Sequence, residues 1–376
     1  MSDLNSSLGA GDLGPGEPRP ADESSAKPPL RPYLGRRSRQ TQRVGYAVVG
    51  LGHLAERAIL PAFEGSRKSR VVAVVSGNAQ RAWEVAKPYG AADFSYDEYD
   101  ACLAKPEVEA VYIASVNSAH ADQAVRAAAA RKHVLCEKPM APTVKECRRM
   151  IEACEATRVR LMIAYRKYFE PASQALKILI GKGELGRLKI IHSTFTVNLP
   201  DTKTAAWHLD KDVAGGGSLV DVGVYCVNTA RWLLGTEPLE ASAYAWTVDP
   251  KRFREVEENM AFRLIFPEGV VLEASCSFGV ARSSFLRVHG ERGWAALDPA
   301  YAYDYERRLF GEIEGKRFHR YFPRMEEFSL ELDAFADCVR RGRDPEPSGW
   351  QGLRDVAVME AVYRAAQEKR TVRVEK

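Results

Sequence analysis

Three residues of this chain have side chains and surroundings suited to moving a proton, namely Lys138, Asp221 and Tyr225. Lys138 lies two residues after an apolar stretch that ends at Cys136, and an ammonium there would stabilise a developing alkoxide and lower the pKa of a neighbouring acid. Asp221 and Tyr225 are four residues apart in a predicted helix, so they share a face that can hold hydroxyl groups and transfer their protons. The residues alone leave alternatives open: an exposed turn lysine, and a helix cap or buried hydrogen bond for the other pair.

A glycine-rich turn lies between an apolar strand pattern and a helical pattern, in the segment Gly50-Leu-Gly52-His-Leu-Ala55. Gly50 lets the backbone reverse, Gly52 has no Cβ to block a pyrophosphate, and Ala55 lets the helix pack on the strand. The N-terminal amides of that helix would then face the phosphates. A second apolar strand at 71–75 completes a βαβ unit, which favours a dinucleotide site over an accidental glycine-rich turn.

The residues after this second strand indicate which dinucleotide is preferred. An NAD site usually has an acidic residue there for the ribose hydroxyls, whereas this chain has Ser76-Gly-Asn-Ala-Gln-Arg81. A serine hydroxyl and an arginine can donate to a 2′-phosphate, which an acid would repel, so we predict NADP. The alternative is that Ser76 is an ordinary turn residue and Arg81 a solvated helix residue.

The hydropathy pattern changes near Tyr165 and predicts two different domains. Before it, apolar strands alternate with helical patterns, which is typical of an α/β, doubly wound parallel sheet; we expect strands at 44–49, 71–75, 109–114, 133–136 and 159–164. After it, strands follow one another and predict an open, mostly antiparallel sheet in an α+β domain. We expect strands at 187–199, 239–247, 259–266, 269–278, 284–289 and 293–297, and helices at 169–181, 218–234, 324–341 and 350–368.

These patterns divide the chain into four segments. Residues 1–42 are rich in Gly, Pro, Ser and Asp and predict a flexible arm without a secretory signal, although Arg31–Arg37 has the aromatic and basic residues to dock on the folded body. Residues 43–165 form the predicted Rossmann domain, and 166–349 the α+β substrate and oligomerisation domain. The helix in 350–376 must bury an apolar face, and we expect it to pack back on the Rossmann domain.

Composition excludes several other classes of protein. The chain has 376 residues, 45% hydrophobic, and a net charge of +4, which is too small and too evenly spread to indicate nucleic-acid binding. No apolar run reaches the roughly 20 residues of a membrane helix. The seven cysteines form no CxxC pair and the seven histidines show no metal-ligand spacing, so we expect reduced thiols, no metal and a cytoplasmic protein.

The motifs GLGxxA, EKP at 137–139 and GGGxxxDxGxY at 215–225, in this order, resemble the Gfo/Idh/MocA oxidoreductases, and more closely their glucose-fructose oxidoreductase branch. The resemblance covers about 43–374. It implies that Lys138 lies beside the nicotinamide, that Asp221 is an orienting carboxylate and that Tyr225 is the acid/base. Two features depart from that branch: the export signal is absent, and His208 follows Trp207 in a segment less rich in arginine, so a ketose acceptor is not assumed.

The turn and the resemblance together imply the binding residues. The expected cofactor contacts are Gly50, Leu51, Gly52, His53, Leu54, Ser76, Gly77, Asn78, Arg81, Ala114, Ser115, Asn117, His120, Glu137, Lys138, Arg166 and Trp207, with Arg36 and Arg37 from the arm. The expected substrate contacts are Lys138, Tyr165, His208, Asp221, Tyr225 and Tyr303.

The activity that the resemblance implies is a ping-pong reaction on sugars. Tightly held NADP(H) would oxidise one aldose at C1 to an aldonolactone and then reduce a second aldose to an alditol. The partners would be small aldoses and other copies of the chain, in a dimer or a dimer of dimers. The alternatives are a sugar or diol dehydrogenase that exchanges NADP, a ketose-accepting enzyme, and a non-catalytic sugar or dinucleotide sensor.

Overall fold

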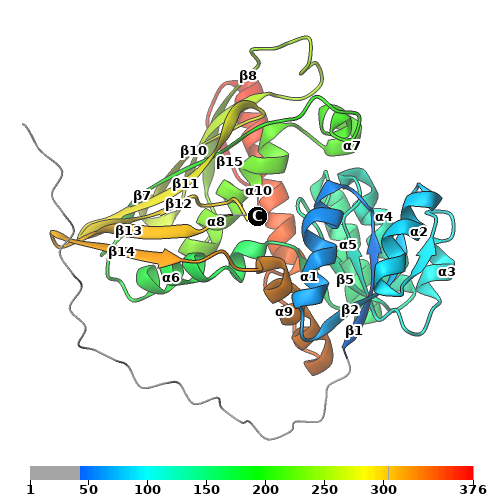
Figure 1. Ribbon diagram of the computed structural model, residues 1–376. Helices are drawn as coiled ribbons and strands as arrows, with labels where there is room; N and C mark the ends of the chain where they lie inside the picture. Colours follow the sequence, from blue (N-terminus) through cyan, green and yellow to red (C-terminus); the bar gives the residue numbers. More distant parts are fainter. Residues whose placement is uncertain (1–42, 304, 376) are drawn as a thin grey trace, which may run out of the picture. The chain divides into compact units, whose positions relative to one another are not determined.

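The structure is a computed structural model that describes residues 43–303 and 305–375 (Figure 1). The expected N-terminal arm, with Arg36 and Arg37, lies outside the described residues. Within the described residues, none of the helices combines the length and the apolar character needed to cross a bilayer.

A six-stranded parallel sheet forms the first part of the described chain, in the order β3-β2-β1-β4-β5-β6. Its strands are β1 (Val44–Val49), β2 (Ser69–Val75), β3 (Ala92–Phe94), β4 (Ala110–Ile113), β5 (His133–Cys136) and β6 (Leu161–Ile163). The helices between them are η1 (Ala55–Ile59), α1 (Leu60–Gly65), α2 (Ala79–Ala86), η2 (Lys87–Tyr89), α3 (Tyr99–Leu103), η3 (Asn117–Ala119), α4 (His120–Ala129) and α5 (Val144–Thr157). The predicted parallel sheet is confirmed. β3 was not predicted, because Ala92-Asp-Phe94 has no apolar pattern of its own and is defined by pairing with β2.

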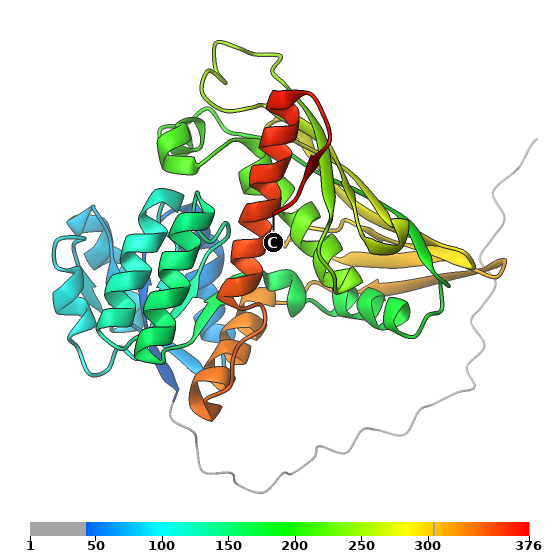
Figure 2. The ribbon, with the colours of Figure 1, turned by 180° about the vertical axis from the view of Figure 1, so that it is seen from behind.

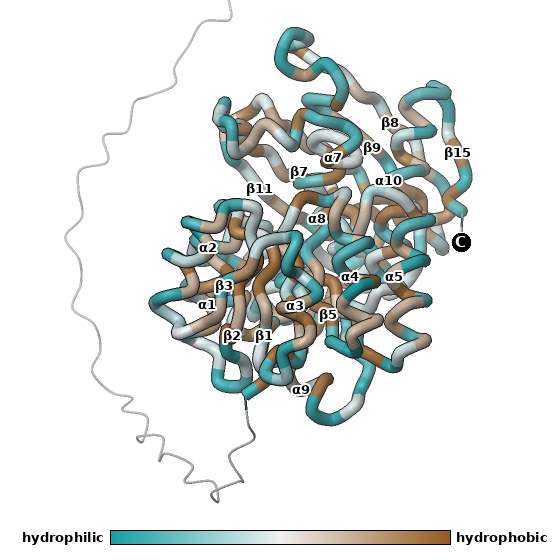
Figure 3. The backbone as a smooth tube through the Cα atoms, turned by 90° about the vertical axis from the view of Figure 1, so that its right-hand side faces the viewer, coloured by the Kyte–Doolittle hydropathy of each residue, from teal (hydrophilic) through white to brown (hydrophobic). Residues whose placement is uncertain are grey.

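The strand order reverses at β1, which pairs with β2 on one side and with β4 on the other. Such a switch point opens a crevice at the carboxyl ends of the strands, where doubly wound sheets bind their ligands. The central strands are buried on both faces, every residue of β1 and of β4 included. Figure 3 shows the hydrophobic colour along these strands.

A nine-stranded sheet forms the second part, in the order β14-β13-β12-β11-β7-β10-β9-β8-β15. Its strands are β7 (Leu188–Asn198), β8 (Glu240–Trp246), β9 (Asn259–Ile265), β10 (Val271–Ser277), β11 (Gly279–Gly290), β12 (Gly293–Asp298), β13 (Arg307–Ile313), β14 (Lys316–Phe322) and β15 (Val372–Arg373). β7 and β10 run parallel, and the other neighbours pair antiparallel. The predicted mostly antiparallel sheet is confirmed, but β13, β14 and β15 were missed. β14 is an exposed strand of mainly basic residues, so its sequence lacks the apolar alternation that signals a strand.

Helices cover one face of this second sheet (Figures 1 and 2). They are α6 (Pro171–Gly181), which contacts β13, α8 (Val224–Leu234), which contacts β7, and α10 (Gly349–Glu368), which contacts β8. Shorter turns are η4 (Arg166–Tyr168), η5 (Ala206–Leu209), α7 (Lys211–Ala214), η6 (Leu219–Gly223) and η7 (Pro267–Gly269). The opposite face exposes large side chains, among them Ile190, Phe285 and Tyr244.

The last two helices connect the two sheets. α9 (Glu327–Arg341) packs on α1, and its Phe335 meets the ring of Tyr46 in β1 at 6.5 Å between centroids. α10 contacts α5 as well as β8, and the chain then returns as β15 along β8 (Figure 2). The sequence led us to expect that the C-terminal helix packs back on the Rossmann domain. α10 contacts β8 in addition to α5, because buried residues are spread around much of its surface.

Candidate active site

The glycine-rich turn between β1 and η1 has the shape of a phosphate cradle. Gly50 adopts a φ of 94°, and a Cβ there would approach the backbone nitrogen of Ser115 to 2.6 Å. A Cβ on Gly52 would meet no atom within 4 Å, so this glycine borders open space. Leu51 is buried, and His53 is exposed at the same turn. Small residues beside open space at the start of a helical segment fit a bound dinucleotide.

The segment after β2 forms a tight turn in which side chains accept hydrogen bonds from the turn's own backbone. The Ser76 hydroxyl accepts from the backbone N–H of Asn78 at 3.2 Å. The Asn78 side chain caps α2 by accepting from the backbone N–H of Arg81 at 3.0 Å. Nε of Arg81 lies 2.5 Å from Oε1 of Glu56 in η1. No sequence spacing indicated Glu56, because it precedes Arg81 by 25 residues and only the fold brings the two together.

The loop after β4 is held by side chains that the sequence assigned to the cofactor. Asn117 is buried and donates to the carbonyl oxygen of Ala214 at 2.8 Å. His120 is fully buried, and its two ring nitrogens lie 3.0 Å from the carbonyl oxygen of Pro139 and 3.2 Å from that of Ser115. Burial lowers the pKa of His120. Both side chains therefore position loops around the crevice, including Ala114 and Ser115 beside Gly50.

The turn after β5 places Lys138 against the second part of the chain. Its ammonium donates to Oδ1 of Asp221 at 2.8 Å and to the carbonyl oxygen of the same residue at 2.7 Å. Burial opposes the charge of Lys138, but the Asp221 carboxylate outweighs it and raises the lysine's pKa above its ordinary value. Burial likewise opposes the charge of Asp221, whose pKa is nevertheless lowered by Lys138 and then by His208. Both groups are therefore charged at neutral pH.

Glu137 and Pro139 fix the direction of this turn. The buried Glu137 carboxylate accepts from the Tyr112 hydroxyl at 2.9 Å and from the backbone N–H of Lys138 at 3.2 Å. Burial raises the pKa of Glu137. The peptide bond between Lys138 and Pro139 is cis. Glu137 thus supports the turn from behind rather than facing the open crevice.

Tyr225 is the second residue of α8, which directly follows the π-helical turn η6, and η6 carries Asp221. Its ring lies between two cations, with the Lys138 nitrogen 5.1 Å and the Arg166 guanidinium 5.2 Å from the ring centroid. The rings of Phe195 and Tyr301 pack against it at 5.5 and 5.7 Å. Both cations are within the range at which a positive charge is attracted to an aromatic ring, so they hold the Tyr225 ring beside the Lys138–Asp221 pair.

Arg166 is buried and firmly anchored. It donates to Oε2 of Glu327 at 2.7 Å and to the carbonyl oxygen of Tyr301 at 2.5 Å. Its guanidinium also lies 5.2 Å from the ring of Tyr303, which meets Phe328 edge-on. Glu327 belongs to α9, near the far end of the chain, and nothing in the sequence pattern connected it to the site.

Trp207 and His208 form one wall near Asp221. Their rings stack with centroids 3.8 Å apart, and Nδ1 of His208 lies 3.0 Å from the carbonyl oxygen of Ala205. Both are partly exposed, and the charge of His208 acts on the Asp221 carboxyl. The structure therefore brings His208 into the same cluster as Lys138 and Asp221.

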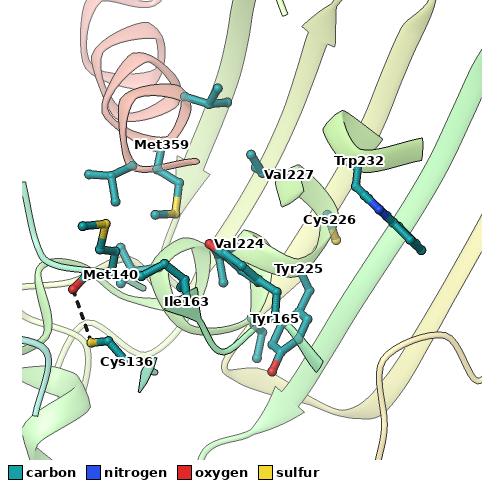
Figure 4. Close-up of a cluster of buried hydrophobic side chains, with 14 of the residues drawn as sticks. Cys136, Met140, Ile163, Tyr165, Val224, Tyr225, Cys226, Val227, Trp232 and Met359 are labelled. Atoms are coloured by element: carbon teal, nitrogen blue, oxygen red, sulfur yellow. Dashed lines mark hydrogen bonds between the residues drawn. The ribbon is translucent and has the colours of Figure 1, made fainter. Parts of the chain in front are cut away.

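Tyr165 is placed differently from the substrate contact that the resemblance implied. Its side chain is 1% exposed and packs on Tyr168, in the buried cluster that Figure 4 shows around Ile163 and Val224. Burial and then Asp355 of α10 raise the pKa of Tyr165 well above its ordinary value. Its hydroxyl interacts with Asp355, and burial this deep indicates core packing rather than the substrate contact that the resemblance implied.

A parallel sheet with an open glycine turn, combined with a lysine, an acid and a tyrosine from two parts of the chain, defines a dinucleotide-dependent oxidoreductase. Within the described residues, no group of three or more His, Cys, Asp and Glu side chains is arranged to hold a metal ion. Residues 44–165 match the oxidoreductase family with an NAD-binding Rossmann fold, Gfo/Idh/MocA, and 173–296 match the Gfo/Idh/MocA C-terminal domain. The chain belongs to the Gfo/Idh/MocA family and is an enzyme, as the motifs indicated.

Three relatives illustrate the similarity. The crystal structure of aldose-aldose oxidoreductase from Caulobacter crescentus, complexed with glycerol, is 37% identical, with a TM-score of 0.84 over 88% of this chain and 100% of that one. D-xylose 1-dehydrogenase (NADP+) from Haloarcula marismortui is 30% identical over 88% of this chain and 93% of its own length. D-xylose 1-dehydrogenase (NADP+) 2 from Haloferax volcanii is 31% identical over 86% and 97%.

Proposed function

We propose that this enzyme is an NADP-dependent aldose oxidoreductase that oxidises one aldose at C1 to an aldonolactone and reduces a second to an alditol with the same cofactor. The observation that carries the proposal is the Lys138 ammonium held by two Asp221 oxygens beside the ring of Tyr225. The relatives named for aldoses and for D-xylose support a sugar as the substrate class.

The chain's own residues account for the proton transfers. A nicotinamide held beside Lys138 would supply the hydride chemistry, in which the C1 hydrogen leaves with its electron pair and is later returned to a second sugar. During oxidation the Tyr225 oxygen takes the proton of the C1 hydroxyl, so the C–H and O–H bonds break as the carbonyl forms. During reduction Tyr225 gives that proton to the carbonyl oxygen of the acceptor. Lys138 stabilises negative charge on the sugar oxygen, and Asp221 keeps the ammonium in place.

The preference for NADP is supported by the turn after β2. No carboxylate follows that strand directly in the sequence, while the Ser76 hydroxyl and the Arg81 guanidinium, which is paired through Nε with Glu56, could donate to a 2′-phosphate. Both D-xylose dehydrogenases carry NADP+ in their names. The cofactor contacts proposed on this basis are those around Gly50, Ser76 and Lys138.

A nucleotide-free assay tests the proposal. The purified protein is mixed with an aldose and no added cofactor, and the products are quantified by chromatography. We expect the aldonic product and the alditol in equal amounts, because a retained cofactor must be reoxidised in place by a second sugar. The same assay with a ketose added tests whether that acceptor competes.

The second candidate is an ordinary sugar or diol dehydrogenase that exchanges NADP, which the names of the two D-xylose dehydrogenases favour. Oxidation that needs stoichiometric added NADP and yields no alditol would establish it and reject the first candidate. Binding of nucleotide without conversion of any sugar would instead indicate a sensor.

The remaining parts of the proposal concern segments and assembly. We propose that 43–165 hold the cofactor, that 166–349 bind the sugar and contact other copies, and that the segment up to Arg37 contributes to cofactor retention. Deleting that segment should make turnover depend on added NADP. We also propose a cytoplasmic dimer or dimer of dimers, which light scattering after gel filtration and fractionation of the source cells would test.

A further inference from the structure

An acidic side chain lies beside the proposed cofactor site, although it does not belong to the segment after β2. This residue is Glu56 of η1. The residues directly after β2 lack the carboxylate of an NAD site, yet the Glu56 carboxylate lies 2.5 Å from Nε of Arg81. Glu56 is in the first turn of η1, immediately after the glycine-rich turn, and its backbone N–H donates to the carbonyl oxygen of Gly52 at 3.2 Å. The fold therefore supplies the carboxylate that the local sequence omits.

The ion pair bridges the two helical segments that start at the crevice. η1 follows β1 and α2 follows β2, and these strands are paired in register up to Val49 and Val75, their last residues. Arg81 is fixed at its backbone by the Asn78 cap, so its guanidinium has a limited region in which to move. The Glu56 carboxylate and a 2′-phosphate bound after β2 would therefore both interact with the Arg81 guanidinium.

We propose that Glu56 sets the cofactor preference by competing with the 2′-phosphate of NADP for Arg81. With NADP, the Glu56 carboxylate, which holds Nε of Arg81, and the phosphate would share the positive charge of one guanidinium, whereas with NAD the ion pair stays intact. Glu56 thus weakens NADP binding while leaving NAD binding nearly unchanged. It therefore lowers the ratio of NADP affinity to NAD affinity. This inference rests on the dinucleotide site of the proposed function.

The size of the effect follows from the exposure of the pair. The Arg81 and Glu56 side chains are 50% and 28% exposed, so water screens their attraction. Exposed ion pairs are typically worth about 0.2–1 kcal/mol, which corresponds to a change of about 1.5- to 5-fold in an equilibrium constant. Glu56→Gln should therefore tighten NADPH by about two- to fivefold and change NADH affinity by less than that.

The test measures dissociation constants rather than turnover. NADPH and NADH are titrated by calorimetry into the full chain after charcoal has removed any copurified nucleotide. Glu84→Gln is the matched control, because Glu84 lies exposed on the same helix as Arg81, carries the same charge and bonds to Gln80 instead. A rise in the NADPH preference for Glu56→Gln, but not for Glu84→Gln, supports the proposal. An equal rise for both variants would mean that only the net charge of the protein matters, and it would overturn the proposal.

A double variant separates competition from direct repulsion. In an Arg81→Gln background there is no guanidinium to compete for, so adding Glu56→Gln should leave NADPH affinity nearly unchanged. An undiminished effect in that background would overturn the competition. If wild-type protein binds neither nucleotide, the proposed function itself fails. If it binds NADPH but Glu56→Gln has no effect, only this inference fails.

Discussion

Lys138 donates to two oxygens of a single residue, the carboxylate and the main-chain carbonyl of Asp221, at 2.8 and 2.7 Å. Lys138 lies in the turn after β5 of the parallel sheet, and Asp221 lies in the π-helical turn η6 of the second part. The ammonium therefore links the turn after β5 to the segment that leads into α8, which carries Tyr225. Short π-helical segments are frequent at functional sites.

Replacing Tyr225 by phenylalanine should lower the rate of sugar oxidation by about 10²-fold or more, since it removes the positioned acid/base. The ring keeps its contacts with Phe195 and Tyr301, so nucleotide affinity should be unchanged. Tyr165→Phe is the control: it removes a hydroxyl buried near Asp355 and should leave kcat and KM almost unaltered. Rates come from single-turnover absorbance changes of the nicotinamide. Near-normal turnover in Tyr225→Phe would move the acid/base role to another group.

Replacing Asp221 by asparagine should shift the alkaline limb of the pH–rate profile to lower pH. In the wild type the carboxylate raises the Lys138 pKa above its ordinary value, so the ammonium persists through neutral and moderately alkaline pH. In the variant burial is no longer opposed, the lysine loses its proton at lower pH, and the rate falls earlier as pH rises. Asp212→Asn, an exposed acid in α7, is the control. If the alkaline limb does not shift in Asp221→Asn, the protonation of Lys138 does not control the rate.

Replacing Ser76 by aspartate should change the cofactor preference toward NAD. The new carboxylate would repel a 2′-phosphate and accept from the free ribose hydroxyls. Competitive titration of NADPH against NADH measures the ratio of affinities. Unchanged affinities for both would mean that the adenine ribose is not bound at this turn.

Protein stability should fall as the pH drops from about 6.5 to 4, in part because of His133. Burial, followed by the charge of Arg160, lowers the pKa of His133 to about 4, and its Nδ1 accepts the backbone N–H of Arg160 at 3.0 Å. Between the folded and unfolded pKa values the unfolded chain binds the extra proton, so acid favours unfolding. We expect His133 to account for about 1–2 kcal/mol. Urea unfolding at pH 7.5 and 4.5 measures the loss, which His133→Asn should reduce.

The local features of the site could be predicted from short segments of the sequence. The glycine turn was predictable because a backbone reversal beside a phosphate needs residues without a Cβ, and Gly50 and Gly52 fall between a strand and a helix. The spacing of Asp221 and Tyr225 placed them on adjacent turns, and their link to Lys138 followed from the family resemblance. The strands that were predicted well, such as β1 and β7, are those whose residues have a regular pattern of burial.

Only the tertiary structure decided which distant residues complete these segments. Glu56 meets Arg81 and Glu327 meets Arg166 because separate helices end or begin at one crevice, and no local pattern records such pairings. The exposed strand β14 gains its structure from hydrogen bonds to β13 rather than from its own hydropathy. Tyr165 carries the same hydroxyl as Tyr225, but it lies between β6 and η4 with its side chain buried in the core. The sequence by itself determined the chemistry available to this protein, whereas long-range packing determined which of its groups are charged, paired or buried.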